Sequence, residues 1–405
     1  MVEKRFSLLY GALFTVFVLY GASLTIVGAV LPRIFTEFGW RYVDAGLILA
    51  AGSIGGFSSA YVAGSLFRHL GSRLTVLIGL GLIGLGLLLF GISHSVAANL
   101  LLYLTMGLGQ GFLEVAINWC VIRMSKPGDG RGMNLMHGAF AIGAVSGPLA
   151  LGGIMAAKLP WVVTFRGGAL LFALMFLAAL FLPFKRLGRE EGASAHHMKG
   201  LARSPAYWLG FFVLLLYVGA ELGISNWTAE FFVRNFGLGA ATGAMVVSLF
   251  WAGLLAGRLG FPLLLPKART ERLLVVLALC FAMATGLLFA SGSMGAPALD
   301  FGLVAVAAAG LGASCVYPSV ISLVGDAFPE AMAPAIGFAT MGGAMGAFAF
   351  PLAMSGIASA AGLGAGFAFY ALLAALCAAL TFALTTAVRA RSLRSTAERA
   401  RGPAA

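Results

Sequence analysis

The sequence predicts an all-α membrane protein whose twelve transmembrane helices form two pseudo-symmetric six-helix bundles. Three observations predict this fold class: the chain is very hydrophobic, it contains twelve long apolar segments, and its two halves repeat. Of its 405 residues, 60% are hydrophobic and only 10% are charged, whereas soluble domains carry about 25% charged residues. So few charges cannot cover a water-soluble surface, and we expect the chain to be embedded in a lipid bilayer.

The apolar segments are long enough to cross a membrane as helices. A helix needs about 20 residues to span a hydrocarbon core about 30 Å thick. Twelve segments reach this length, and they are rich in glycine, which lets neighbouring helices approach closely in lipid. The predicted spans are residues 6–32, 43–67, 74–93, 97–124, 133–157, 161–184, 206–229, 240–263, 272–292, 301–324, 333–357 and 363–388.

The positions of the basic residues predict the orientation of these spans. If both termini are cytoplasmic, all but five of the 26 Lys and Arg residues lie on the cytoplasmic side, which is the bias that orients membrane proteins. We therefore expect a multi-pass protein of the cytoplasmic (inner) membrane with both termini cytoplasmic. The net charge of +12 resides mostly in these loops, so it favours contact with the lipid bilayer and does not indicate a nucleic-acid partner. The five exceptions are Arg33, Arg41, Lys158, Arg166 and Arg234.

The two halves of the chain repeat at a shift of about 200 residues. "LYGASL" (19–24) matches "LYVGAEL" (216–222), and "GLGQGFLE" (107–114) matches "GLGASCVY" (310–317). Six spans repeated in the same orientation are related by an axis along the membrane normal, and transporters of this plan bind substrate between the halves near the midplane. The expected domains are an N-terminal bundle (1–184), a cytoplasmic connector (185–205), a C-terminal bundle (206–388) and a basic cytoplasmic tail (389–405).

Two loop-like stretches resemble a signature of the major facilitator superfamily, and the span pattern fits that family over essentially the whole chain. The first is "GSLFRHLGSR" between spans two and three, in which Arg68 replaces the acidic residue usual in the signature. The second is its second-half equivalent, "FWAGLLAGRLG" (250–260). The resemblance implies that the residues of these stretches act in gating: Gly64, Arg68, Gly71, Arg73, Gly257 and Arg258.

Within that superfamily the chain most resembles the fucose–proton symporter-type sugar transporters. Four stretches carry the resemblance: "GLGQGFLEVAIN" (107–118), "MNLMHGAFAIGAVSGP" (133–148), "YVGAELGISNW" (217–227) and "GLGASCVYPSVISL" (310–323). The resemblance implies uphill uptake of a monosaccharide driven by a cation, usually H⁺. The group typically carries an acidic residue on span one, where this chain offers only Ser23 and Thr25.

Two acidic residues lie deep in the predicted spans, Glu114 in span four and Glu221 in span seven. A charged side chain near mid-bilayer costs about 2.5–3.5 kcal/mol, so such a residue is a functional candidate. Gln110, Glu114 and Asn118 follow one another at four-residue spacing and share one helix face, which we expect to line a cavity. We expect both acidic residues to act in cation coupling. Structural hydrogen bonding is the alternative for Glu114, and packing between the halves is the alternative for Glu221.

Further candidates for substrate contact lie in other spans. His137 is expected to hydrogen-bond the sugar or to pair with Glu114 in coupling, with a satisfied interior histidine as the alternative. Asn226 follows the acidic residue of span seven, and Pro318 is expected to kink span ten. Three aromatic residues are suited to stack on a sugar ring, with core packing as the alternative for each: Tyr317, Trp251 and Tyr20.

The sequence predicts a secondary active transporter that moves a monosaccharide by alternating access, coupled to H⁺ in preference to Na⁺. The alternative is an exporter or antiporter of hydrophobic or drug-like solutes, whose cavity would be lined mainly by Phe and Met. No nucleotide-binding loop, metal-ligand pair or nucleophile–base set is present, and the four cysteines fit neither metal-ligand nor disulfide spacing. We expect a monomer, no enzymatic activity, and no cofactor or bound metal besides the transported cation.

Overall fold

A computed structural model describes residues 6–125, 131–187, 201–265 and 268–401. Within these residues twelve helices are long and apolar enough to cross a membrane, which confirms the predicted number. The helices are α1 (Ser7–Phe38), α2 (Tyr42–Leu89), α3 (Val96–Met124), α4 (Arg131–Ala156), α5 (Val162–Ala179), α6 (Pro205–Phe236), α7 (Ala240–Leu264), α8 (Thr270–Met294), α9 (Leu299–Ala313), α10 (Val316–Ala327), α11 (Met332–Ala361) and α12 (Leu363–Arg401), with short 3₁₀ helices at Phe184–Leu187, Leu201–Arg203, Ala296–Ala298 and Pro329–Ala331.

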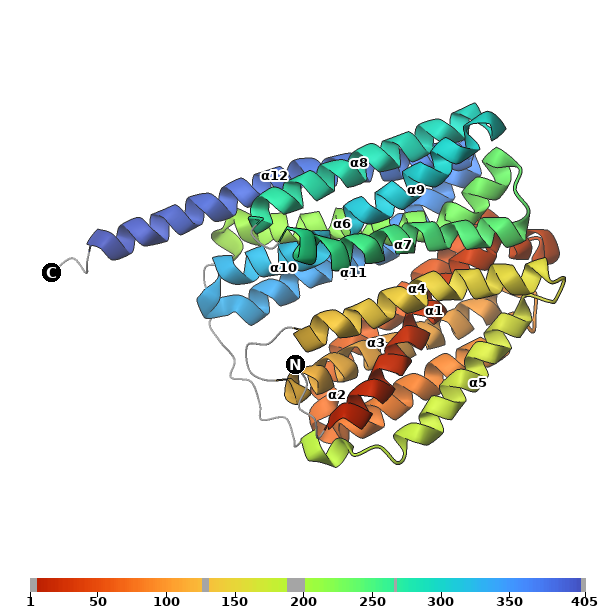
Figure 1. Cartoon of the computed structure of the whole chain (residues 1–405), viewed down its shortest axis with the longest axis horizontal. Coiled ribbons are helices and arrows are strands. Elements are labelled where there is room, and N and C mark those ends of the chain that lie inside the picture. The colour runs from red at the N-terminus through yellow and green to blue at the C-terminus, as the bar shows by residue number, and fades with distance from the viewer. Residues whose placement is uncertain (1–5, 126–130, 188–200, 266–267, 402–405) are drawn as a thin grey trace.

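The spans form two groups of helices that lie side by side (Figure 1). Helices α1–α5 make the first half, because α2 contains spans two and three. Helices α6–α12 make the second half, because α9 and α10 together form span ten. Across the interface α2 packs on α11 and α4 packs on α7, and these two contacts are equivalent under the predicted repeat. The exact domain boundaries stay a prediction, and connector residues 188–200 lie outside the described residues.

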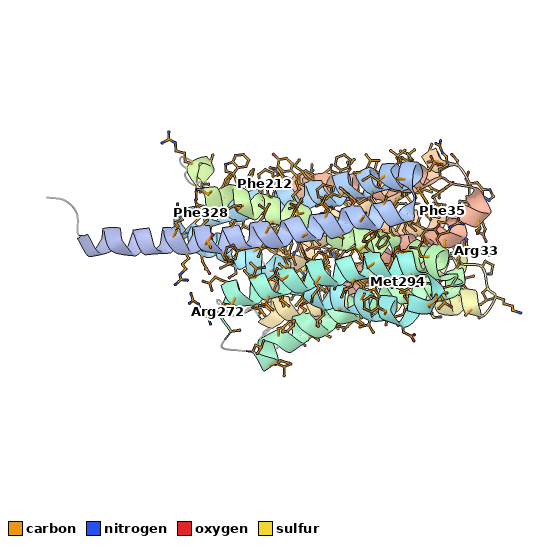
Figure 2. All side chains as sticks on the ribbon, turned by 90° about the horizontal axis from the view of Figure 1, so that it is seen from above. Arg33, Phe35, Phe212, Arg272, Met294 and Phe328 are labelled. Carbon is orange, nitrogen blue, oxygen red and sulfur yellow. The ribbon has the colours of Figure 1, made fainter. Side chains whose placement is uncertain are left out.

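The two ends of the bundle carry different connections. We call the end at which α1 begins the terminal end, and the end carrying the α1–α2 connection the opposite end. Figure 2 shows Arg33 and Phe35 at the opposite end, and Arg272 and Phe328 toward the terminal end, with apolar side chains along the length between them.

Spans one and seven continue beyond their predicted ends. Helix α1 continues to Phe38 and helix α6 continues to Phe236, and each is followed by a glycine with a left-handed backbone, Gly39 (φ +67°) and Gly237 (φ +71°). Glycine adopts this conformation without steric strain and ends helices in this way. The two glycines occupy the same position of the repeat, so the halves also end these helices alike. As a result Glu230 lies inside a helix, beyond the predicted end of span seven at residue 229.

Span ten is broken, and the proline predicted to kink it explains the break. Pro318 has no N–H, so it cannot donate to the carbonyl oxygen four residues earlier, that of Ser314. The regular helix is interrupted at Ser314 and Cys315, between α9 and α10. The irregularity therefore lies one turn before the proline, where it leaves a backbone acceptor for another helix.

Glycine packing brings α3 against α2. A methyl group on Gly107 would overlap the carbonyl oxygen of Gly52, and one on Gly111 would overlap that of Gly56. Such close backbone approach is typical of helix pairs in membranes. The contact fixes the rotation of α3, and with it the face that carries Glu114.

Candidate functional site

A cavity of about 740 Å³ lies between the two halves. Helices α1, α2 and α3 line it from the first half, and α6, α7, α10 and α11 line it from the second half. This is the volume typical of a small-molecule site. The polar and aromatic residues that line it are Tyr20, Thr25, Ser53, Phe57, Tyr61, Tyr103, Gln110, Glu114, Asn118, Ser225, Asn226, Trp251, Tyr317 and Thr340.

The polar face of α3 contributes three of these residues. Asn118 Nδ2 donates to Glu114 Oε1 at 3.1 Å, because four-residue spacing stacks the two side chains on one face. Gln110 Nε2 lies 3.5 Å from the Ser23 hydroxyl oxygen of α1. Asn118 Oδ1 is buried and has no hydrogen-bond partner among the described residues. The face therefore presents a carboxylate, an amide donor that supports it and an available acceptor.

Aromatic residues from both halves meet at the cavity. Tyr20 interacts with Glu114, and its ring packs on Phe140 with centroids 5.2 Å apart. Phe140 in turn packs edge-on against Trp251 of the second half at 5.7 Å. Trp251 Nε1 donates to the hydroxyl of Ser225 at 2.8 Å. Tyr317 completes the aromatic lining from α10.

His137 and Glu221 do not line the cavity. The His137 ring packs edge-on against Phe17 at 5.7 Å and interacts electrostatically with Glu114. The Glu221 side chain is 8% exposed, and its Oε1 lies 2.7 Å from the Tyr217 hydroxyl. Both residues lie behind the cavity wall, so neither contacts a cavity-bound molecule in this conformation.

The described residues of the gating signature belong to two helices, Gly71 and Arg73 to α2, and Gly257 and Arg258 to α7. Gly71 (φ +72°) separates spans two and three within α2, and Arg73 Nε donates to the Ala179 carbonyl at 3.4 Å. Gly257 and Arg258 lie inside α7 and not in a loop, and Arg258 Nε donates to the Ser314 carbonyl at 3.2 Å. The surroundings of Gly64 and the side chain of Arg68 lie outside what the structure describes.

Glu230 is a buried acidic residue that the sequence analysis did not single out. It is 1% exposed, and its Oε1 accepts from the Tyr42 hydroxyl at 3.0 Å and from Arg234 Nε at 2.8 Å. Tyr42 belongs to the first half and Glu230 to the second, so this cluster joins the halves at the opposite end. The sequence feature that predicts this cluster is the four-residue spacing of Glu230 and Arg234. This spacing is typical of ion pairs within a helix, so it indicates that the helix continues past residue 229.

The cavity is closed at the opposite end and opens toward the terminal end. At the opposite end Phe35 of α1 stacks on Trp227 of α6, with centroids 6.3 Å apart. Nearer the cavity, Ser53 donates to the Ala347 carbonyl of α11 at 3.0 Å. Tyr61, about five helical turns further along α2 than Tyr42, lines the cavity and is 81% exposed. The halves therefore meet at one end and leave a mouth at the other.

Comparison with known families identifies the architecture. A family model described as Major Facilitator Superfamily matches residues 13–306. The chain belongs to the Major Facilitator Superfamily. The resemblance predicted from the sequence is thus confirmed, and this major facilitator is a carrier of small molecules across a lipid bilayer and not an enzyme.

Curated relatives and solved structures agree with this assignment. The chain is 25% identical over 283 residues to a Protein TsgA homolog of Erwinia tasmaniensis, covering 65% of this chain and 67% of the relative. Its similarity to a TsgA homolog of Serratia proteamaculans is 23% identity over 325 residues, covering 76% and 77% of the two chains.

Three solved transporters share the fold of this major facilitator. A crystal structure of the nucleoside transporter NupG superposes with a TM-score of 0.73 at 16% identity, covering 95% of this chain and 98% of NupG. FucP in the outward conformation gives 0.63 at 20% identity, with 96% and 99% covered. A bacterial homolog of the human lysosomal transporter Spinster, inward-facing and occupied, gives 0.69 at 15% identity, with 96% and 98% covered.

Proposed function

We propose that this carrier moves a monosaccharide across the cytoplasmic membrane by alternating access, driven by a cation, H⁺ in preference to Na⁺. The observation that carries the proposal is the position of Glu114, the acidic residue among the described cavity-lining residues, on one face with Gln110 and Asn118. A carboxyl group in the wall of a substrate cavity can respond to the substrate and to a proton in the same conformation.

The lining suits a polyhydroxylated ring. A sugar offers hydroxyl donors to the buried Asn118 Oδ1, which has no other described partner, and acceptors to the Gln110 amide. Its apolar ring face can pack on Tyr20, Trp251 or Tyr317, as sugars commonly pack on aromatic side chains. Asn226 adds a polar contact from the second half.

Hydrophobic or drug-like solutes fit this lining less well. Phe57 and Met341 are the Phe and Met residues among the described lining. The other residues of the wall are small, polar, tyrosine or tryptophan, apart from the aliphatic Leu24, Leu49, Val218 and Leu222. A nucleoside is the stronger second candidate, since it combines a ribose with a base that stacks on aromatic side chains. The structural likeness to the nucleoside transporter NupG is a reason to test nucleosides.

A proton suits Glu114 better than a sodium ion. A proton needs one oxygen atom, whereas sodium sites in transporters gather several oxygen ligands. Asn118 Nδ2 already donates to Glu114 Oε1. This N–H group opposes the binding of a sodium ion at the same oxygen. We propose that His137 assists coupling through its electrostatic interaction with Glu114.

The proposed orientation has both termini in the cytoplasm, so the mouth of the cavity faces the cytoplasm in this conformation. The carrier is proposed to act as a monomer, with the glycine and arginine residues of the signature stretches adjusting the helices during gating. A reporter that becomes fluorescent only in the cytoplasm, fused after residue 405, tests the orientation. A dark fusion with an active periplasmic reporter would reverse it.

Uptake into proteoliposomes tests the transport proposal. The panel contains hexoses, pentoses and nucleosides, each offered with an imposed pH gradient and separately with a sodium gradient. We expect accumulation of a monosaccharide under the pH gradient. Glu114→Gln is expected to abolish accumulation while retaining exchange, because the amide cannot release a proton. Asp300→Asn, an exposed carboxyl in the first turn of α9, is the matched control. Full accumulation by Glu114→Gln would remove Glu114 from the mechanism.

A further inference from the structure

Glu221 lies in a buried cluster behind the cavity wall, one helical turn from Tyr217. The Tyr217 side chain is completely buried. Its hydroxyl oxygen lies 2.7 Å from Glu221 Oε1 and 2.8 Å from the carbonyl oxygen of Ala313, on the broken span ten. Both distances are those of O–H···O hydrogen bonds. The cluster therefore contains two short oxygen–oxygen contacts around one phenol.

Two such contacts need two hydrogen atoms. The phenol supplies one, and a backbone carbonyl supplies none. If Glu221 were ionised, one of the two contacts would press lone pairs together without a hydrogen between them. The second hydrogen must then come from the carboxyl group, so that Glu221 donates to Tyr217 and Tyr217 donates to Ala313. We propose that Glu221 holds a proton in this conformation and is a second proton-binding site of the carrier, separate from the cavity.

The surroundings of Glu221 support a neutral carboxyl. Arg258 of α7 is the charged group that interacts with it, but no ion pair forms between them among the described residues, and Arg258 Nε donates to the Ser314 carbonyl. The other titratable groups nearby are uncharged in their ordinary state: Tyr217 on α6, Tyr317 on α10, and Cys377 of α12 beside Tyr217. The described parts of α1, α8, α9 and α11 bring no charged side chain to Glu221.

Loss of this proton would act on span ten. When the Glu221 carboxyl gives its proton to water it becomes a carboxylate, and Arg258 is the described cation that can pair with it. Pairing draws the guanidinium away from the Ser314 carbonyl, the acceptor that Pro318 leaves without its helical donor. Tyr317, three residues after Ser314, lines the cavity. Glu221 is thus a positioning residue that links protonation in the second half to the substrate site. Its part in transport rests on the proposed proton coupling, whereas its protonation does not.

Infrared difference spectra between the wild type and each variant, recorded on the full chain in lipid nanodiscs at neutral pH, test directly whether Glu221 holds a proton. We expect a protonated-carboxyl C=O band in the wild type that is lost in Glu221→Gln and retained in Asp300→Asn. Glutamine keeps an N–H for the Tyr217 oxygen, so the variant should fold. In Tyr217→Phe the band should remain and shift, because the carboxyl loses its hydrogen-bond partner. An identical spectrum for wild type and Glu221→Gln in this region overturns the proposal.

A second readout separates this proposal from the transport proposal. Spin-label distances between the halves are measured against pH without substrate. Wild type should change its distribution as pH rises, and Glu221→Gln, fixed in the neutral form, should lose at least part of that change. Glu114→Gln should retain it. If the band and the pH response are present but no sugar accumulates, the proton site stands and the sugar assignment fails. If sugar accumulates but the Glu221-dependent band is absent, the sugar assignment stands and the proton site fails.

Discussion

The polar face of α3 obtains its chemistry from three residues at four-residue spacing. Glu114 Oε1 accepts a hydrogen bond from Asn118 Nδ2 at 3.1 Å. Asn118 Oδ1 is buried without a described hydrogen-bond partner. A buried acceptor without a hydrogen bond is unfavourable by about 1–3 kcal/mol, so a substrate hydroxyl that donates to it gains affinity. Asn118 thus serves two roles, support of the carboxylate and substrate contact.

Replacement of Asn118 by Ala tests these roles. The variant loses the amide that hydrogen-bonds Glu114 and the acceptor proposed for substrate. Loss of the substrate's hydrogen bond to this buried acceptor costs about 1–3 kcal/mol, so we expect substrate affinity to fall roughly 10- to 100-fold in equilibrium binding of the transported sugar. Thr105→Ala on the same helix is the control, because Thr105 bonds only to its own backbone at Leu101 among the described residues. Equal affinity in wild type and Asn118→Ala would exclude Asn118 from the site.

At the scale of helices, prolines leave carbonyl oxygens that other helices use. Pro318 leaves the Ser314 carbonyl to Arg258, and Pro351 of α11 leaves the Ala347 carbonyl, which accepts from Ser53 of α2 at 3.0 Å. In a membrane an unpaired backbone carbonyl is strongly unfavourable, so each proline favours a specific contact with a polar side chain. One of these contacts holds span ten to α7, and the other joins the halves.

The α2–α3 glycine contact has a testable energetic consequence. Gly107→Ala places a methyl group against the Gly52 carbonyl, and overpacking of this kind is unfavourable by about 1–3 kcal/mol. We expect a lower midpoint of thermal unfolding in detergent. Gly153→Ala of α4, where a methyl group meets no neighbouring atom within 4 Å, should leave the midpoint unchanged or raise it. If the two variants unfold alike, the close packing of α3 on α2 does not contribute to stability.

At the scale of the whole molecule, the halves are joined at the opposite end and apart at the terminal end. The Tyr42–Glu230–Arg234 cluster closes the opposite end. A further contact between the halves is made by Ser248 of α7, which donates to the Val145 carbonyl of α4 at 2.7 Å. Alternating access requires these contacts to break when the cavity opens to the other side. Their strength therefore sets the balance between the two conformations.

Tyr42→Phe should shift this balance. It removes one hydrogen bond to a buried carboxylate, which contributes about 1.5–3 kcal/mol, so the ratio of open to closed molecules at the opposite end should rise roughly tenfold or more. Spin-label distances between the halves at that end measure the ratio. Arg41→Gln is the control, because Arg41 pairs with Asp44 of the same half through a side chain that is 78% exposed, and ion pairs open to solvent contribute about 0–1 kcal/mol. An unchanged distance distribution in Tyr42→Phe would show that the cluster does not hold this end closed.

The fold class, the twelve spans, the family and the shared face of Gln110, Glu114 and Asn118 could be predicted from the sequence alone. The fold class, the spans and the shared face follow from hydropathy, span length and helical spacing, which are local properties of the chain. The family follows from the resemblance of its signature stretches. The domain boundaries and the roles of the site residues stay predictions.

Which side chains meet could not be predicted, because it depends on how the helices pack. Glu221 and Glu114 both lie deep in spans, yet one is behind the cavity wall and the other faces the cavity. Glu230 joins Tyr42 from a helix 188 positions away in the sequence. Helices that are apolar nearly all round show little amphipathic signal, so the rotation of each helix, and the end at which the halves close, are set by packing against neighbours.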